Sequence, residues 1–247
     1  MTRLRVATWN VHEGISVDGA MPDDPSSFWT VLVDAEVDVA ALQEVCFPAP
    51  GDLGDLALAA ELAGMPHVVS FPLSASSFRK GELAGLALLS RYPFRDEQQV
   101  KLPNPELRDE RNGTVVTSYD KGLLSAVLDR NGDSVRVVSL HAPPFHRFGR
   151  APAEFGSIWA ALAKSIGPVD ELPLLVVGDF NTSRRELLTE QVDGRLYRAI
   201  GDQDTHCGKA ADDILYTEAF ELVSSKVIGT RSDHALCLAE FEPSSDP

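Results

Sequence analysis

The chain has 247 residues, 44% of them hydrophobic, and a formal net charge of −15 at pH 7. No run reaches the roughly 18 apolar residues of a membrane span, the N-terminus lacks the pattern of a cleaved signal peptide, and three cysteines in no paired spacing argue against a disulfide framework. We therefore expect a cytoplasmic, monomeric protein with no membrane span. We expect a single domain over residues 1–242 and a flexible tail over 243–247.

Short β-rich runs alternate with helical patterns along the chain. Strands are predicted at Leu4 to Trp9, Val37 to Leu42, His67 to Phe71, Leu83 to Leu89, Leu123 to Leu128, Val135 to Leu140, Leu174 to Val177, Asp213 to Tyr216 and Ala235 to Phe241. Asn131-Gly132 supplies the positive φ angles of a hairpin turn between two of them.

Helices are predicted at Pro25 to Glu36, Leu53 to Leu62 and Ala153 to Ser165, with a short one after Asn181 that starts at the capping-box spacing of Ser183 and Glu186. Segments 94–120 and 142–152 are rich in Pro, Gly and charge and are predicted to be long loops, which are often functional in a compact domain. Many strands with outer helices indicate an α/β fold in which two sheets pack face to face.

The negative charge is concentrated in the N-terminal third of the chain. Residues 6–78 contain eleven acidic residues and neither Lys nor Arg. Phosphate backbones repel such a chain at long range, which argues against a protein that grips long nucleic acids through a basic surface. A phosphate substrate is still compatible with this charge, because a bound divalent cation reverses the local field.

Polar residues recur at the ends of the predicted buried strands. They are Asn10, Glu44, His141, Asp179, Asn181, Asp212, Asp233 and His234. A single polar residue at a strand end is usually a cap or a turn residue, but a series made only of Asn, Asp, Glu and His is harder to explain in that way. Together they predict a pit lined by acids and imidazoles at one edge of the sandwich.

These residue types suit metal-assisted hydrolysis of a phosphoester. Mg²⁺ or Mn²⁺ takes hard oxygen ligands, which Glu44 and Asn10 would supply, and polarises the phosphoryl oxygen. A histidine exchanges a proton with attacking water or with the leaving group when a carboxylate orients it. His234 and Asp212 are the candidates for that pair.

Two further residues would act on the water and the phosphate. Asp179 would position or deprotonate the attacking water, and Asn181 would donate an amide N–H to the phosphate. Either Asp179 or His234 serves as the base, and the sequence does not distinguish the two.

At these residues the sequence resembles the endonuclease/exonuclease/phosphatase superfamily of deoxyribonuclease-I-like, metal-dependent phosphoesterases. The matching motifs span nearly the whole chain, in the superfamily's order: Thr8-Trp9-Asn10-Val11, Leu42-Gln43-Glu44, Leu140-His141-Ala142-Pro143, Gly178-Asp179-Phe180-Asn181, Asp212-Asp213-Ile214-Leu215 and Ser232-Asp233-His234. The resemblance implies a four-layer α/β/β/α sandwich, with two packed mixed sheets flanked by helices and a divalent-metal site at one edge.

The resemblance also implies a role for each motif residue. Glu44 would be the chief ligand of Mg²⁺ or Mn²⁺, assisted by Asn10 and Asp233. The catalytic residues would be His141, Asp179, Asn181, Asp212 and His234. His141 matches the second histidine of deoxyribonuclease-I-like members, which favours the deoxyribonuclease-I, sphingomyelinase and small-substrate branches.

Departures from the family pattern leave alternatives open. His12 stands where several DNA-repair members carry an Asp, and it contacts either a phosphate or metal or only a local hydrogen-bond partner. Asp213 is an alternative to Asp212 as the partner of the catalytic histidine. Glu82 is a candidate carboxylate partner for His141.

Basic loop residues beside the motifs are candidates for phosphate contact, because guanidinium groups pair well with phosphate oxygens. With His12, the predicted phosphate contacts are Arg147, Arg150 and Arg184, and Arg185 lies next to the last of these. His206-Cys207 has no partnering Cys or His pattern and is predicted to be a turn.

The sequence therefore predicts a divalent-metal-dependent phosphoesterase that hydrolyses a phosphodiester by in-line attack of water. Nucleic acid is the first substrate class, in a deoxyribonuclease-like reaction. The alternatives are a phosphatase or phosphodiesterase that acts on a small-molecule, lipid head-group or tyrosyl-DNA phosphoester, although a sphingomyelinase is expected to carry an exposed apolar hairpin that is not evident. A non-catalytic binding module on the same fold is the rival class, and it would be expected to have lost some of these acids and imidazoles.

Overall fold

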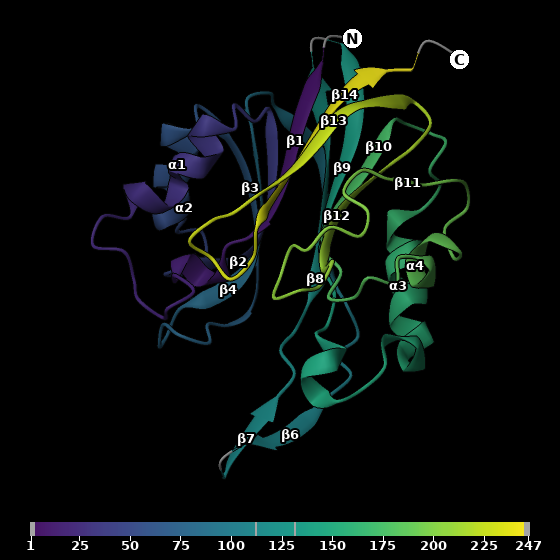
Figure 1. Cartoon of the computed structure of the whole chain (residues 1–247). Coiled ribbons are helices and arrows are strands. Elements are labelled where there is room, and N and C mark those ends of the chain that lie inside the picture. The colour runs from purple at the N-terminus through teal and green to yellow at the C-terminus, as the bar shows by residue number, and fades with distance from the viewer. Residues whose placement is uncertain (1–2, 112, 131, 245–247) are drawn as a thin grey trace.

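The computed structural model describes residues 3–111, 113–130 and 132–244, and its strands form two six-stranded sheets (Figure 1). The first sheet contains, in spatial order, β13 (Phe220–Ile228), β14 (Leu236–Pro243), β1 (Leu4–Asn10), β2 (Val39–Phe47), β4 (Leu83–Ser90) and β3 (His67–Ala75). The second contains β11 (Tyr197–Arg198), β12 (Asp212–Tyr216), β10 (Leu174–Asp179), β9 (Asp133–His141), β8 (Gly122–Arg130) and β5 (Phe94–Lys101). A separate hairpin pairs β6 (Arg108–Arg111) with β7 (Thr114–Thr117).

Both sheets are mixed, as predicted. In the first sheet β1 and β2 run parallel, and in the second β9 and β10 run parallel, whereas the other pairs are antiparallel. Parallel neighbours end at the same edge of a sheet. Asn10, His141 and Asp179, the last residues of β1, β9 and β10, are therefore brought to sheet edges.

Alternating strand residues supply two packed faces on each sheet, since successive side chains of a strand point to opposite sides. The inner faces share one core, in which Val6 of the first sheet packs with Val137 of the second. The outer face of the first sheet shares a core with Phe28, and that of the second with Trp159. The helices that supply these aromatic residues are α1 (Ser26–Asp34) and α3 (Gly156–Ile166), and the other two are α2 (Asp55–Leu62) and α4 (Glu186–Thr189) (Figure 1).

Every predicted strand is present, within a few residues at its ends. The predicted hairpin is confirmed by the antiparallel pairing of β8 and β9, in which Arg130 faces Asp133, while Asn131 lies outside the described residues. The helix predicted from Ala153 is divided, because a 3₁₀ turn over Pro152–Phe155 precedes α3. The predicted capping box does not form, since the side chain of Glu186 binds Arg184 instead.

The prediction that 94–120 is a loop is wrong. This segment contains β5, β6 and β7. β5 is the edge strand of the second sheet, and most of its side chains are exposed, so it lacks the apolar alternation that identifies a strand. β13, an edge strand of the first sheet, was not predicted for the same reason.

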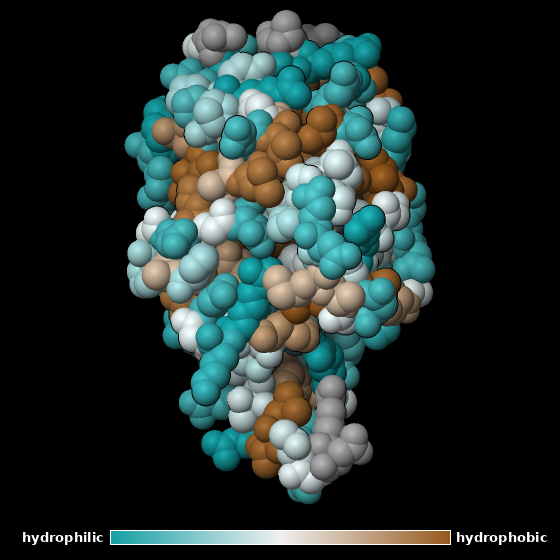
Figure 2. All heavy atoms as spheres, turned by 90° about the vertical axis from the view of Figure 1, so that its left-hand side faces the viewer, coloured by the Kyte–Doolittle hydropathy of each residue, from teal (hydrophilic) through white to brown (hydrophobic). Residues whose placement is uncertain are grey.

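The hairpin of β6 and β7 projects from one end of the sandwich (Figures 1 and 2). Val115 at this end is 64% exposed, and Figure 2 shows hydrophobic atoms on the projection. The opposite strand has the sequence Arg-Asp-Glu-Arg, so the hairpin is of mixed character.

Other expectations concern thiols, membranes and the tail. Cys46, Cys207 and Cys237 are free. No helix in the described ranges is long and apolar enough to cross a membrane. Of the predicted tail, Pro243 ends β14 and the backbone N–H of Ser244 donates to the carbonyl of Ala219, whereas residues 245–247 lie outside the described part.

Candidate active site

The register of the sheets gathers the motif residues at one edge. Asp179 at the end of β10 faces His141 of β9 on one side and Asp212 of β12 on the other. In the other sheet, Asn10 ends β1, and its Nδ2 donates to Oδ2 of Asp179 at 3.1 Å. This buried hydrogen bond joins the edges of the two sheets at the centre of the site.

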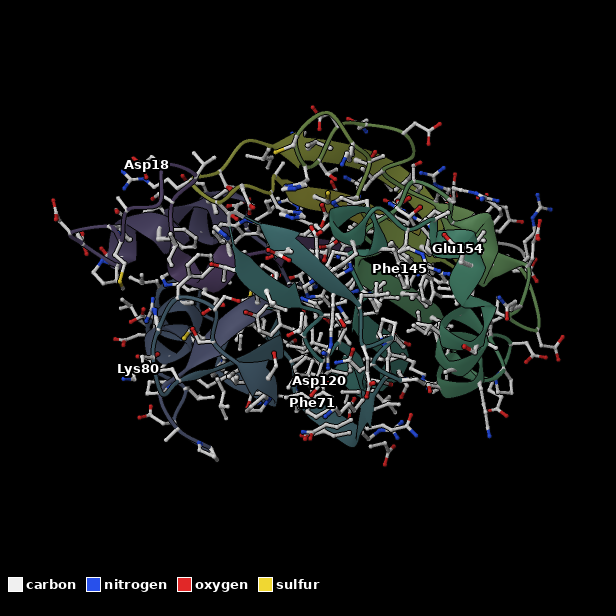
Figure 3. All side chains as sticks on the ribbon, turned by 90° about the horizontal axis from the view of Figure 1, so that it is seen from below. Asp18, Phe71, Lys80, Asp120, Phe145 and Glu154 are labelled. Atoms are coloured by element: carbon white, nitrogen blue, oxygen red, sulfur yellow. The ribbon has the colours of Figure 1, made fainter. Side chains whose placement is uncertain are left out.

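A cavity of about 490 Å³ opens at this edge. Most of the predicted site residues line it, namely Asn10, His12, Glu44, His141, Arg147, Asp179, Asn181, Asp233 and His234. Seen from the end that carries the hairpin, Asp120 lies near the middle of the molecule, with Lys80 on one side and Phe145 and Glu154 on the other (Figure 3). The cavity is lined by residues of both sheets and of the loops that follow β3 and β9.

A β-bulge turns Glu44 out of its strand. The register between β2 and β4 shifts between Gln43 and Val45, and Glu44 has a φ of 53°. Its Oε1 lies 3.3 Å from Nζ of Lys121 and 3.7 Å from Nε2 of His141. Burial raises the pKa of Glu44, but the neighbouring positive charges, that of Lys121 above all, lower it more, so that the pKa is about 2.

Lys121 is a site residue that sequence reasoning missed. Its Nζ lies 3.2 Å from Nδ1 of His141. An ammonium group only donates, so Nδ1 accepts in this contact and Nε2 carries the ring proton. Nε2 faces Oδ2 of Asp179 at 3.4 Å. The available signal was its position just before β8, whose Gly122 pairs with His141.

Asp179 is the most heavily hydrogen-bonded carboxylate of the cavity. Its Oδ1 accepts the backbone N–H of Asn181 at 2.8 Å, and its Oδ2 accepts Nδ2 of Asn181 at 3.2 Å. Burial raises its pKa, but His234 and His141 lower it further, to well below the usual range. The second amide hydrogen of Asn181 goes to the carbonyl of Ala142 at 2.9 Å. The amide of Asn181 therefore positions Asp179 in this structure, and neither of its hydrogens is left for a phosphate.

Asp212, and not Asp213, is the partner of His234. Nδ1 of His234 lies 2.8 Å from Oδ2 of Asp212, and both side chains are buried. Asp213 instead accepts Nε of Arg185 at 3.2 Å and Nε of Arg198 at 2.8 Å.

His234 binds its proton tightly because Asp212 lies beside it. Burial lowers the pKa of His234, but Asp212 and Asp179 raise it more, to about 10. The pKa of Asp212 is itself raised, by burial and by the charge of Asp179.

His206 is a second residue that sequence reasoning missed. Its backbone forms the predicted turn, bridging to Lys209, but its ring enters the cavity and stacks on His234 with centroids 4.0 Å apart. Nδ1 of His206 lies 2.9 Å from the carbonyl oxygen of Asp233, so this nitrogen donates. No spacing signal identifies such a contact, because it joins two loops that the fold brings together.

His12 and Arg147 lie in the cavity wall. The backbone N–H of His12 donates to Oδ1 of Asn10 at 3.0 Å, and its Nδ1 lies 3.4 Å from the carbonyl of Ile15 and 3.9 Å from Oδ1 of Asp233. His12 thus has local hydrogen-bond partners and also faces the cavity.

Three other candidates lie outside the cavity lining. Arg150 binds Glu154 on the surface and Arg184 binds Glu186, so neither guanidinium belongs to the cavity lining. Glu82 accepts from Sγ of Cys46 at 3.0 Å and does not meet His141. Both arginines follow a motif in the sequence, but each pairs with a nearby glutamate on the surface instead of pointing into the cavity.

The donor set fits a hard divalent cation. Glu44, Asn10 and Asp233 present carboxylate and amide oxygens to the same cavity. Two groups also have ligand atoms within 4.8 Å of one another, namely His206 with Asp233 and His234, and Asp179 with Asp212 and His234. Carboxylate and amide oxygens are the ligands that hard divalent cations prefer.

The fold and the site together define a class of phosphoester-hydrolysing enzymes. The model of the endonuclease/exonuclease/phosphatase family matches residues 7–234, so the chain belongs to this family of phosphoester-hydrolysing enzymes. No curated protein matches the chain in sequence.

Solved structures share the fold at low sequence identity. An endonuclease/exonuclease/phosphatase from Beutenbergia cavernae is 21% identical with a TM-score of 0.74, over 100% of this chain and 73% of that one. The human Nocturnin catalytic domain with bound sulfate is 18% identical with a TM-score of 0.65, over 98% and 95% of the two chains. Sphingomyelinase C from Streptomyces griseocarneus is 17% identical with a TM-score of 0.61, over 97% and 99%.

Proposed function

We propose that this chain is a divalent-metal-dependent phosphodiesterase that acts by in-line attack of water. The observation that carries the proposal is the buried contact of His234 with Asp212, placed beside Asp179 in the cavity that also contains Glu44 and Asn10. An oriented imidazole next to hard oxygen donors is the combination that such a hydrolysis needs.

Asn10, Glu44 and Asp233 would hold the cation. When bound, Mg²⁺ or Mn²⁺ polarises the phosphoryl oxygen and offsets the negative charge that develops on the phosphate. The low pKa of Glu44 keeps its carboxylate ionised and available for this role across the neutral range.

Asp179 and His234 have different roles in the proposed reaction. Asp179 is ionised and held by Asn10 and Asn181, so it accepts a hydrogen bond from the attacking water and orients it. His234 is protonated at neutral pH and donates from Nε2 to a phosphoryl oxygen. This charge state favours Asp179 over His234 as the group that faces the water.

His141 and Lys121 would contact other oxygens of the phosphoester than His234 does. Nε2–H of His141 points toward the carboxylates of Asp179 and Glu44, from where it donates to the leaving oxygen or to a non-bridging one. Lys121 fixes that tautomer through Nδ1 and adds positive charge beside the phosphate.

The surroundings of the cavity favour a small phosphoester or a free strand end over a duplex held along its length. The chain carries a net charge of −15. Arg150 and Arg184, which were expected to contact phosphate, are neutralised by neighbouring glutamates. Long-range attraction to a duplex is correspondingly weak.

Hydrolysis of bis(p-nitrophenyl) phosphate and nicking of supercoiled plasmid test the proposal. We expect release of nitrophenol that requires Mg²⁺ or Mn²⁺ and falls by several powers of ten in His234→Ala and Asp179→Asn. Asp34→Asn, an exposed change at the end of α1, is the control and leaves the rate unchanged. Turnover that survives a chelator, or that is intact in His234→Ala, contradicts the proposed mechanism.

A further inference from the structure

Two exposed aromatic side chains belong to the wall of the same cavity. Among the large hydrophobic residues that the described part of the chain leaves exposed, the aromatic ones are Phe78, at 52%, and Tyr119, at 44%. Both line the cavity. Leaving a large ring in water forgoes the stabilisation that its burial would give, so the coincidence of both rings at this cavity points to a ligand.

The two rings come from separate segments of the chain. Phe78 lies in the loop between β3 and β4 of the first sheet, and Tyr119 lies between β7 and β8, where the chain enters the second sheet. A ligand in the cavity is therefore within reach of residues from two separate segments.

The segment of Phe78 is anchored by a buried carboxylate that the proposed chemistry leaves unused. Glu13 is 3% exposed, and its carboxylate accepts the hydroxyl of Ser76 and the backbone N–H of Ser77, the latter at 2.9 Å. Nη2 of Arg79 donates to the carbonyl of Glu13 at 2.9 Å. The ring of Phe78 also meets His12 edge to face, with centroids 4.9 Å apart. Phe78 is thus held in its exposed position.

The segment of Tyr119 is anchored in the same manner. Ser118 is buried, and its hydroxyl accepts the N–H of Leu107 at 2.9 Å and donates to Oδ1 of Asn104 at 2.7 Å. Nδ2 of Asn104 donates to Oδ1 of Asp120 at 2.9 Å. The residues on both sides of Tyr119 are therefore fixed, which lowers the cost of ordering this segment when a ligand binds.

We propose that Phe78 and Tyr119 bind a planar aromatic group of the substrate, a nucleobase, while its phosphoester lies against Asp179 and His234. The inference rests on the proposed function, because it takes the acid and imidazole end of the cavity as the phosphate end. A ring face stacks on any base, which gives affinity for a nucleotide without reading its sequence. The cavity volume of about 490 Å³ lies in the range typical of small-molecule sites. The substrate class is therefore a nucleotide, or the terminal nucleotide of a strand.

Equilibrium binding of adenosine 5′-monophosphate and of ribose 5-phosphate separates the base from the rest of the ligand. Calorimetry with Mg²⁺ present is expected to show the nucleotide binding at least tenfold more tightly to the unmodified protein. Phe78→Ala and Tyr119→Ala are each expected to weaken nucleotide binding at least fivefold and to leave ribose 5-phosphate unchanged. Tyr119→Phe keeps the ring and retains the nucleotide affinity. Val223→Ala, which removes an exposed side chain from β13, is the matched control and changes neither affinity.

The outcomes keep this inference distinct from the proposed function. The role of Phe78 and Tyr119 is overturned, even if hydrolysis is metal-dependent, by any of three results. These are equal affinity for the two ligands, no binding of the nucleotide, or an equal loss of affinity for both ligands in the alanine variants. If the protein has no hydrolytic activity but prefers the nucleotide in a way that depends on Phe78 and Tyr119, the nucleobase site is supported and the proposed reaction is overturned instead.

Discussion

The imidazole of His206 stacks on that of His234, with ring planes inclined by only 17°. His206 is fixed by its hydrogen bond to the carbonyl of Asp233, and His234 is fixed in the plane of its own ring by Asp212. The stacking on His206 restrains the tilt of the His234 ring, and the hydrogen bond to Asp212 restrains its rotation. His206 is therefore a positioning residue for the proposed catalytic imidazole.

Replacement of His206 is expected to change turnover more than substrate binding. His206→Ala removes the stacked face, a contact of about 0.5–1.5 kcal/mol, and we expect kcat to fall three- to tenfold with KM nearly unchanged. His206→Phe keeps a planar ring and restores most of kcat. Steady-state rates with bis(p-nitrophenyl) phosphate give both constants. A raised KM with an intact kcat would assign His206 to the substrate instead.

Glu44 is expected to control the response of the protein to metal. Because a cation that binds only the folded state stabilises it with the logarithm of its concentration, the Tm of the unmodified protein should rise with Mg²⁺ above Kd. In Glu44→Gln we expect most of this rise to disappear. Glu61→Gln, an exposed change on α2 with the same loss of charge, should keep it. The same dependence of Tm on Mg²⁺ in all three proteins would remove Glu44 from the ligands.

The strand-end residues could be predicted because they depend on local patterns. A buried apolar run followed by Asp or His fixes where the strand ends, and the parallel pairs β1–β2 and β9–β10 bring such ends together. Asp179 and His141 are adjacent for this reason alone.

What the sequence did not reveal depends on contacts between distant segments. Lys121 meets Glu44 across 77 positions, and β12 and β13 separate His206 from His234 in the chain, with no spacing rule for either contact. The edge strands β5 and β13 were missed because an exposed strand with one paired neighbour needs no apolar face. The choice between Asp212 and Asp213 needed the positions of Arg185 and Arg198, which only the folded chain defines.

The pair of His234 and Asp212 is expected to make stability depend on pH in the alkaline range. The pKa of His234 is raised to about 10 in the folded state, against about 6.5 in an unfolded chain, so the folded state binds the proton more tightly. This stabilisation is complete below pH 6.5 and is lost as the pH rises through about 10. Chemical denaturation at pH 7 and pH 10.5 with a chelator present should show a loss on the order of a few kcal/mol that is absent in His234→Asn. Parallel losses in the two proteins would contradict the assignment.

Gly178 is expected to be essential for the packing that places Asp179. Its φ is 148°, and a Cβ at this position would lie 2.0 Å from the carbonyl oxygen of Leu140 in the neighbouring strand β9. Backbone atoms of a central strand cannot move aside, so Gly178→Ala should lower the free energy of unfolding by about 3 kcal/mol or more and reduce activity by displacing the next residue. Gly156→Ala is the matched control, because a Cβ at Gly156 in the first turn of α3 would meet no atom within 4 Å. That change should be neutral or stabilising by up to about 1 kcal/mol. Urea denaturation of the three proteins measures both effects, and a Gly178→Ala protein as stable as the Gly156→Ala control would show that β9 and β10 separate more easily than their register implies.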